Sequence, residues 1–218
     1  MSIVYLDLPM LPENAIQECL IAAKKHINLS QNKQYDDFLN IIKDLKFNNN
    51  QKFGKYEVLG NVWSYNTRKQ LKNLYREYFT EDIYFSFGKF SNMHSINCSF
   101  PPHRDKNRCL GINFLIVSGG DHVETVTYSK KISNNTITKK NINNPYNDKI
   151  INYENVIVDV KECVPIHKWY CFNADEFHSL ENLQSDRYVV FLILKDKEKV
   201  ITYNHFIKKY NHLIKKKS

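Results

Sequence analysis

The chain has 218 residues, of which 42% are hydrophobic and 25% charged, and its formal net charge is +8. This composition supports a buried core and excludes collagen-like, coiled-coil and low-complexity classes, and no apolar run approaches the roughly 20 residues of a membrane span. The positive charge accompanies no nucleic-acid recognition motif, so we expect neither nucleic acid nor a membrane as partner.

Five cysteines occur in the chain, and no two of them form a CxxC pair. An odd number without that spacing argues against a disulfide framework and against a structural zinc site. The first residues lack the basic segment and the cleavage site of a secretory signal. We therefore expect a cytoplasmic protein that folds as a single domain over residues 1–218.

Residues 1–82 are predicted to be mostly helical, after one short strand. Apolar side chains recur there every three or four residues in three segments, which is typical of helices that bury one face. The third segment opens with Thr67 and, three residues later, Gln70, the spacing of a capping box. The predicted elements are a strand over 3–7 and helices that begin at Pro12 or run over 36–46 and 67–79.

Residues 83–200 are predicted to form a β core. Short runs of β-branched and aromatic residues alternate with turn residues such as Pro101-Pro102, and the polar stretch 131–153 is predicted to be a long loop. The predicted strands are 83–90, 95–100, 110–117, 124–129, 155–160, 168–173 and 188–194.

Strands that follow a block of helices favour an α+β, mainly β fold. The expected architecture is a double-stranded β-helix, a jelly-roll or cupin-like barrel with the N-terminal helices packed on one sheet. Residues 201–218 are predicted to be a short helix or a basic C-terminal tail.

One constellation of residues carries chemistry. His103 and Asp105 stand two apart at a predicted strand start, so they point to the same side of the strand. His178 lies close to another strand, beyond the long loop. Two imidazoles and one carboxylate on one face of an octahedron are typical of Fe(II) sites with three open positions. His122 and Glu124 form a rival HxE pair, which we rank lower because it follows a glycine turn.

The segments SFPPHRDKNRCLGINFLIVSGGDHVETVTY and WYCFNADEFHSLENLQSDRYVVFLIL resemble the Fe(II)/2-oxoglutarate-dependent dioxygenase superfamily, nearest to its aspartyl/asparaginyl hydroxylase-like and phage-type members. The shared pattern is a proline-led HxD, a basic residue shortly after it, then F-N-x-x-x-x-H-S-x-x-N and an arginine. The resemblance implies that His103, Asp105 and His178 hold Fe(II). It also implies that Arg187 binds the distal carboxylate of 2-oxoglutarate, for which a planar guanidinium is suited.

Further roles follow from the same resemblance. Asn113 is expected near the cosubstrate, and Arg108 is expected to hold either the cosubstrate or a substrate carboxylate. The serine that such families often carry two residues after the arginine is absent here. A hydroxyl from Tyr128 or Thr127 is therefore expected to complete the carboxylate pocket.

The implied activity is hydroxylation of a small-molecule or peptide substrate, in which dioxygen and 2-oxoglutarate are consumed and succinate and CO2 are released. Asp105 favours hydroxylation over halogenation, since a halogenase needs that coordination position for chloride. Arg104 and Arg108 favour an anionic substrate. The alternative is a cupin-like barrel that binds a ligand without catalysis, and a third hypothesis is a basic module that associates with nucleic acid.

Overall fold

A computed structural model describes residues 3–26, 52–94, 96–105, 108–130, 138–140 and 147–215. The helix predicted over 36–46 lies outside these ranges. The helices are α1 (Glu13–His26), α3 (Tyr65–Arg76) and α4 (Tyr203–Lys209), with 3-10 turns η1 (Tyr153–Asn155) and η2 (Asn211–Leu213). No helix in these ranges is long and apolar enough to span a membrane.

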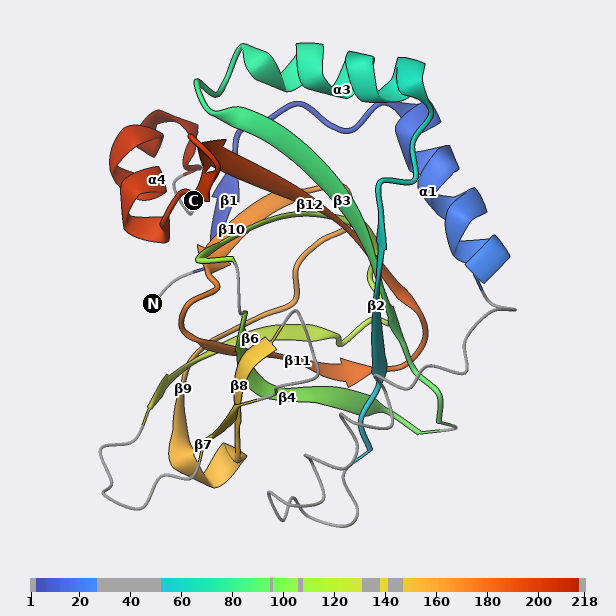
Figure 1. The fold of residues 1–218 in the computed structure, drawn as a ribbon. Coiled ribbons are helices and arrows are strands. Elements are labelled where there is room, and N and C mark those ends of the chain that lie inside the picture. The colour runs from blue at the N-terminus through green and yellow to red at the C-terminus, as the bar shows by residue number, and fades with distance from the viewer. Residues whose placement is uncertain are drawn as a thin grey trace.

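The first sheet is antiparallel and carries the helices on its outer face (Figure 1). Its spatial order is β1-β10-β5-β12-β3-β2, with β13 paired to β12. Its strands are β1 (Val4–Leu6), β2 (Lys55–Gly60), β3 (Asp82–Ser91), β5 (Leu110–Val117), β10 (Trp169–Asn173), β12 (Arg187–Asp196) and β13 (Lys199–Val200).

The second sheet is also antiparallel, with the order β7-β8-β4-β11-β6-β9. Its strands are β4 (Cys98–Asp105), β6 (Glu124–Lys130), β7 (Thr138–Lys140), β8 (Asn147–Ile151), β9 (Val156–Glu162) and β11 (Phe177–Leu183). The two sheets face each other, and residues of both line one cavity between them. The α+β, mainly β class is confirmed, whereas closure of the sheets into a barrel is not shown.

Side chains alternate along the strands of the first sheet, and this alternation separates the core from the cavity. Val190, Leu192 and Leu194 of β12 point outward into the core under the helices, where they join Leu71 of α3 and Phe206 of α4. The helices are therefore packed on one sheet as predicted. The other face of β12 is left to line the cavity.

Strand β4 differs from the sequence-based expectation because it runs through Pro101-Pro102, the predicted turn. Between its pairings with His178 and Leu180 of β11, β4 takes up one extra residue. Proline cannot donate a ladder hydrogen bond, and such a bulge accommodates residues that do not pair. His103 and Asp105 consequently lie at the end of a strand rather than at its start.

Three other predictions are corrected. The stretch 131–153 contains β7 and β8 rather than only a loop, and β2 lies within the part predicted to be mostly helical. The cap of α3 is Ser64, whose hydroxyl accepts a hydrogen bond from the Thr67 amide at 3.3 Å. Thr67 is instead inside the helix, and its hydroxyl donates to the Glu18 carboxylate at 2.7 Å. The same carboxylate accepts from the Ser64 amide, so Glu18 connects α1 to the start of α3.

The C-terminal segment is part of the folded unit. Phe206 of α4 is fully buried, and the Lys215 amide donates to the Tyr5 carbonyl at 2.9 Å. The Asp7 amide donates to the Leu213 carbonyl at 2.7 Å. The part of residues 201–218 that the structure describes therefore packs against β1 instead of fraying.

Candidate metal centre

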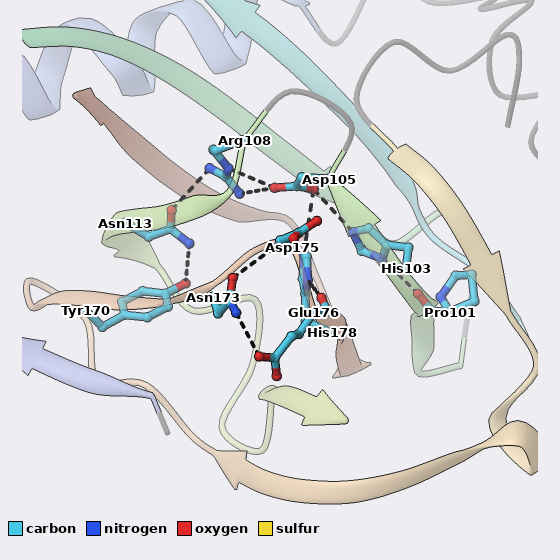
Figure 2. A network of polar contacts seen from close by, with 10 residues as sticks. All are labelled: Pro101, His103, Asp105, Arg108, Asn113, Tyr170, Asn173, Asp175, Glu176 and His178. Carbon is cyan, nitrogen blue, oxygen red and sulfur yellow. Dashed lines mark hydrogen bonds and ion pairs between the residues drawn. The ribbon is translucent and has the colours of Figure 1, made fainter. Parts of the chain in front are cut away.

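His103, Asp105 and His178 come together at the facing ends of β4 and β11 (Figure 2). His103 and His178 are directly opposite each other in the strand pairing. The Nε2 atom of His103 lies 3.8 Å from Asp105 Oδ1, and that of His178 lies 3.7 Å from the same oxygen. One ligand atom from each residue lies within 4.8 Å of the others, so a single metal ion can reach all three.

Backbone carbonyls orient both imidazoles. The Nδ1 atom of His103 is 2.8 Å from the Pro101 carbonyl oxygen, and that of His178 is 3.0 Å from the Glu176 carbonyl oxygen. A carbonyl oxygen only accepts, so we assign the ring proton to Nδ1 in each case. The lone pair of each Nε2 then points toward the carboxylate, which is the tautomer that a metal ligand requires.

Burial and neighbouring charges set the protonation of this trio. Burial penalises the charged imidazolium and lowers the pKa of both histidines, and a charge on His103 would add to this effect on His178, whose pKa falls to about 3. Burial alone would raise the pKa of Asp105, but that pKa is held below its usual value, and the Arg108 guanidinium is the main cause of the lowering. All three side chains are thus deprotonated at neutral pH, as metal binding requires.

The metal-free protein is expected to lose stability as the pH falls from about 6.5 toward about 3. Within that window the unfolded chain protonates His178 and the folded chain does not, so acid favours unfolding. This histidine contributes a slope of up to about 1.4 kcal/mol per pH unit. Urea unfolding with a chelator present measures the slope. His178→Ala should flatten it, and an unchanged slope would contradict the assignment.

Arg108 holds the other oxygen of the Asp105 carboxylate. Its Nε and Nη2 atoms donate to Asp105 Oδ2 at 2.8 and 2.7 Å, and its Nη1 donates to Asn113 Oδ1 at 3.4 Å (Figure 2). The guanidinium also lies over the Phe191 ring, 4.7 Å from its centroid. Arg108 therefore fixes the carboxylate so that Oδ1 faces the two imidazoles.

Arg108→Met is expected to lower the free energy of unfolding by about 3 kcal/mol, because the Asp105 carboxylate would stay buried without its main cationic partner. The pKa of Asp105 should rise in the same variant. Urea unfolding measures the loss. Arg76→Met, on the exposed end of α3, is the matched control and should change stability little. A similar small loss for Arg108→Met would show that the pair is not needed.

Arg187 lies at the deep end of the same cavity and is almost fully buried, with 1% of its surface exposed. Its Nη1 donates to the Ser118 carbonyl at 3.2 Å, and its Nη2 lies 3.3 Å from Thr125 Oγ1 and 3.4 Å from the Tyr170 hydroxyl. No ion pair of the described part of the chain includes this guanidinium. A buried cation without an anion is unfavourable, so the cavity is suited to a ligand carboxylate.

Tyr170 connects the two ends of the cavity, and no pattern in the sequence singles it out. Its hydroxyl accepts hydrogen bonds from Asn113 Nδ2 at 3.2 Å and from Arg187. With both lone pairs engaged, its own O–H remains able to donate to a bound ligand. Side chains alternate along β10, but the sequence does not show whether Trp169, Tyr170 or Cys171 faces Arg187.

Tyr128 and Thr127, the predicted hydroxyl donors for the carboxylate pocket, are not brought to Arg187. The Tyr128 hydroxyl contacts Ser179 at 2.7 Å and also Glu181, and Tyr128 is not among the residues that line the cavity. Thr127 pairs with His178 instead, and its buried hydroxyl has no hydrogen-bond partner among the described residues. Thr125, two residues earlier on the same face, takes the predicted place.

The cavity has a volume of about 310 Å³ and holds the three candidate ligands, Arg108, Asn113 and Arg187 in its wall. This size is within the range of small-molecule sites. The rival pair His122 and Glu124 is absent from the metal-binding group found in the described ranges, and Glu124 contacts Lys161 instead. Two imidazole nitrogens and one carboxylate oxygen, all deprotonated and on one side, fit a divalent transition metal.

Comparisons with known proteins leave the family open. No protein-family model matches the chain, and no curated protein matches it. Among solved structures, the chain is similar to AviO1 from Streptomyces viridochromogenes Tue57, with a TM-score of 0.40 and 11% sequence identity over 89% of this chain and 90% of that chain. A likeness at this level carries no argument about family or activity.

Proposed function

We propose that this protein is a non-haem Fe(II)- and 2-oxoglutarate-dependent oxygenase that hydroxylates an organic substrate, on a double-stranded β-helix. The observation that carries the proposal is the placement of a two-histidine, one-carboxylate group in one cavity with a buried guanidinium that lacks an anion. Either feature by itself is compatible with many kinds of protein. Together they match the two needs of a metal site that works with a keto diacid.

The three ligands would hold Fe(II) through His103 Nε2, His178 Nε2 and Asp105 Oδ1. Because they approach from the two neighbouring strands β4 and β11, they leave the side toward the cavity open. Bound iron together with the keto acid supplies the oxidising chemistry that no side chain provides. The protein supplies the fixed orientation of the ligands, since each has a hydrogen-bond partner behind it.

Arg187 would bind the distal carboxylate of 2-oxoglutarate through its guanidinium. Tyr170 would donate its hydroxyl hydrogen to the same carboxylate, and Thr125 would hold the guanidinium in place. Charge-assisted hydrogen bonds of this kind are about twice as strong as neutral ones. Arg187 is almost fully buried, and an electrostatic interaction is stronger in a buried site than in water.

The decisive experiment is an anaerobic titration of the protein with Fe(II) and 2-oxoglutarate. We expect a weak visible charge-transfer band, and succinate once dioxygen is admitted with substrate. Glutarate, which has both carboxylates but no ketone, is the matched control and should give no band. If neither the band nor succinate appears, the oxygenase proposal is wrong and the alternative of a non-catalytic ligand-binding protein is favoured.

A further inference from the structure

The cavity is longer than the metal and the cosubstrate require. Arg187, Val189, Phe191 and Ile193 follow one another along the inner face of β12, and all four line the cavity. At about 3.3 Å per residue, the first and the last are about 20 Å apart. Phe191 pairs with Ser86 of β3 whereas Arg187 pairs with Phe90, so Phe191 and Ile193 lie toward the opposite end of β12 from Arg187.

We call this part of the cavity the outer chamber and define it by the cavity-lining residues Val58, Ser86, Phe191 and Ile193. Strand pairing places Phe90 opposite Arg187 and Tyr56 opposite Phe90, so these two aromatic residues belong to the Arg187 end of the sheet. Their rings stack on each other with centroids 4.5 Å apart, and Tyr56 meets the Phe191 ring edge-on at 6.4 Å. The wall of the outer chamber itself is mainly apolar, because Val58, Phe191 and Ile193 line it.

Gly88 leaves room for the Phe191 ring. A Cβ atom at this position would lie 2.4 Å from a ring carbon of Phe191, so any larger residue would displace the ring. The Phe191 ring can thus lie against β3, and the Arg108 guanidinium lies over the same ring. The position of the Phe191 ring therefore depends on the absence of a side chain at Gly88.

The outer chamber offers no cation that is free to bind an anion. The charged residues in the cavity wall are Asp105, Arg108 and Arg187, within the described ranges. Arg108 is neutralised by Asp105 through two hydrogen bonds, and Arg187 is at the deep end. Arg104 is not in the wall and lies over the Phe177 ring at 5.6 Å. A carboxylate here would lose its hydration without gaining a partner.

Ser86 supplies the single hydroxyl of the chamber that is not carried by an aromatic ring. This hydroxyl has no hydrogen-bond partner in the described part of the chain, and Ser86 faces Phe191 across the pairing of β3 with β12. One hydroxyl among apolar walls can orient a neutral ligand through an amide or hydroxyl group. This is the usual composition of a small-molecule site, which is mostly apolar with few polar groups.

We propose that the outer chamber binds an uncharged, apolar part of the substrate and discriminates against an anionic group there. The inference rests on the proposed function in one respect, since that function reserves Arg187 for the cosubstrate. It replaces the expectation of an anionic substrate, which was based on Arg104 and Arg108. Arg108 is paired with Asp105, and Arg104 lies over the Phe177 ring.

Benzamide and benzoate test the proposal, since they share shape and size and differ in charge. Each is titrated calorimetrically into the full-length metal-free protein, with and without saturating 2-oxoglutarate. Binding that 2-oxoglutarate displaces is assigned to Arg187, and binding that persists is assigned to the outer chamber. With 2-oxoglutarate present, benzamide should bind saturably and at least about tenfold more tightly than benzoate, because only the anion loses hydration without compensation.

A charge introduced at the rim should reverse this preference. Ile193→Lys places an ammonium group in the chamber and should strengthen benzoate binding by about tenfold while weakening benzamide binding. Ile157→Lys makes the same change at an exposed position of β9 and should alter neither. Thermal unfolding of both variants verifies that they remain folded.

The outcomes separate this inference from the proposed function. Benzoate binding as tight as benzamide binding in the presence of 2-oxoglutarate overturns the inference, and so does an Ile193→Lys variant with unchanged preference. If the chamber behaves as expected but the anaerobic band is absent, the oxygenase proposal fails and the neutral ligand site stands. If the band appears without the preference, only the inference fails.

Discussion

Arg187→Met is expected to weaken the binding of 2-oxoglutarate by about a hundredfold or more while Fe(II) binding is retained. Removal of one partner from a buried, hydrogen-bonded charge pair costs about 2–5 kcal/mol, and each 1.4 kcal/mol is about tenfold in affinity. The guanidinium does not touch the candidate ligands, since its contacts are Ser118, Thr125 and Tyr170. Calorimetric titrations of 2-oxoglutarate and of metal measure the two effects separately.

The same variant should be as stable as the natural protein or more stable. Arg187 has no anionic partner in the described structure, so its replacement leaves no carboxylate unpaired. Replacement of buried charges by apolar groups of similar volume is often neutral or stabilising. Urea unfolding without ligand measures this, and saturating 2-oxoglutarate should stabilise only the natural protein.

Lys89→Met is the matched control for this prediction. Lys89 is also a buried cation, on the neighbouring strand β3, but it pairs with Asp186 at 2.9 Å. Its loss should lower stability and leave 2-oxoglutarate binding unchanged. If Arg187→Met is destabilised as much as Lys89→Met, or binds 2-oxoglutarate normally, Arg187 is a structural residue and not a cosubstrate anchor.

His178→Ala is expected to abolish the anaerobic charge-transfer band and to weaken metal binding by more than about a hundredfold. Loss of an outer partner of a metal ligand already costs about 10–100-fold, and loss of the ligand itself removes a direct bond. His178 is 6% exposed and its Nε2 atom lies 3.7 Å from Asp105 Oδ1. No neighbouring side chain can take over this position in the ligand set found among the described residues.

The control for this variant is His122→Ala, which removes the histidine of the rival HxE pair. His122 is exposed beside the glycine turn and contributes to no metal-binding group in the described ranges. Its band and metal affinity should equal those of the natural protein. A band that survives in His178→Ala and disappears in His122→Ala would relocate the metal site and refute the ligand assignment.

The candidate ligands show which kind of inference a sequence supports. The spacing of His103 and Asp105 placed both side chains on one side of a strand, and the structure has them so, although at the end of β4. Alternation is a local property with a period of two residues, so it survives an error in the strand boundary. The same logic failed for the hydroxyl partner, where Tyr128 or Thr127 was predicted, because the selection of Thr125 needs the position of Arg187 on another strand.

Local patterns along the chain were sufficient for the mainly β class, the helices on one face and the residue types of the candidate centre, because hydrophobic period and residue chemistry are local. The pairing of His103 with His178, the engagement of Arg108 by Asp105 and the isolation of Arg187 became visible only in the folded molecule. These contacts depend on strand register, which is set by the burial of one face of each sheet. In the case of the two histidines, the register brings together residues that are about 75 positions apart in the sequence. The proposed function therefore rests mainly on residues that the sequence named and that the fold brought together.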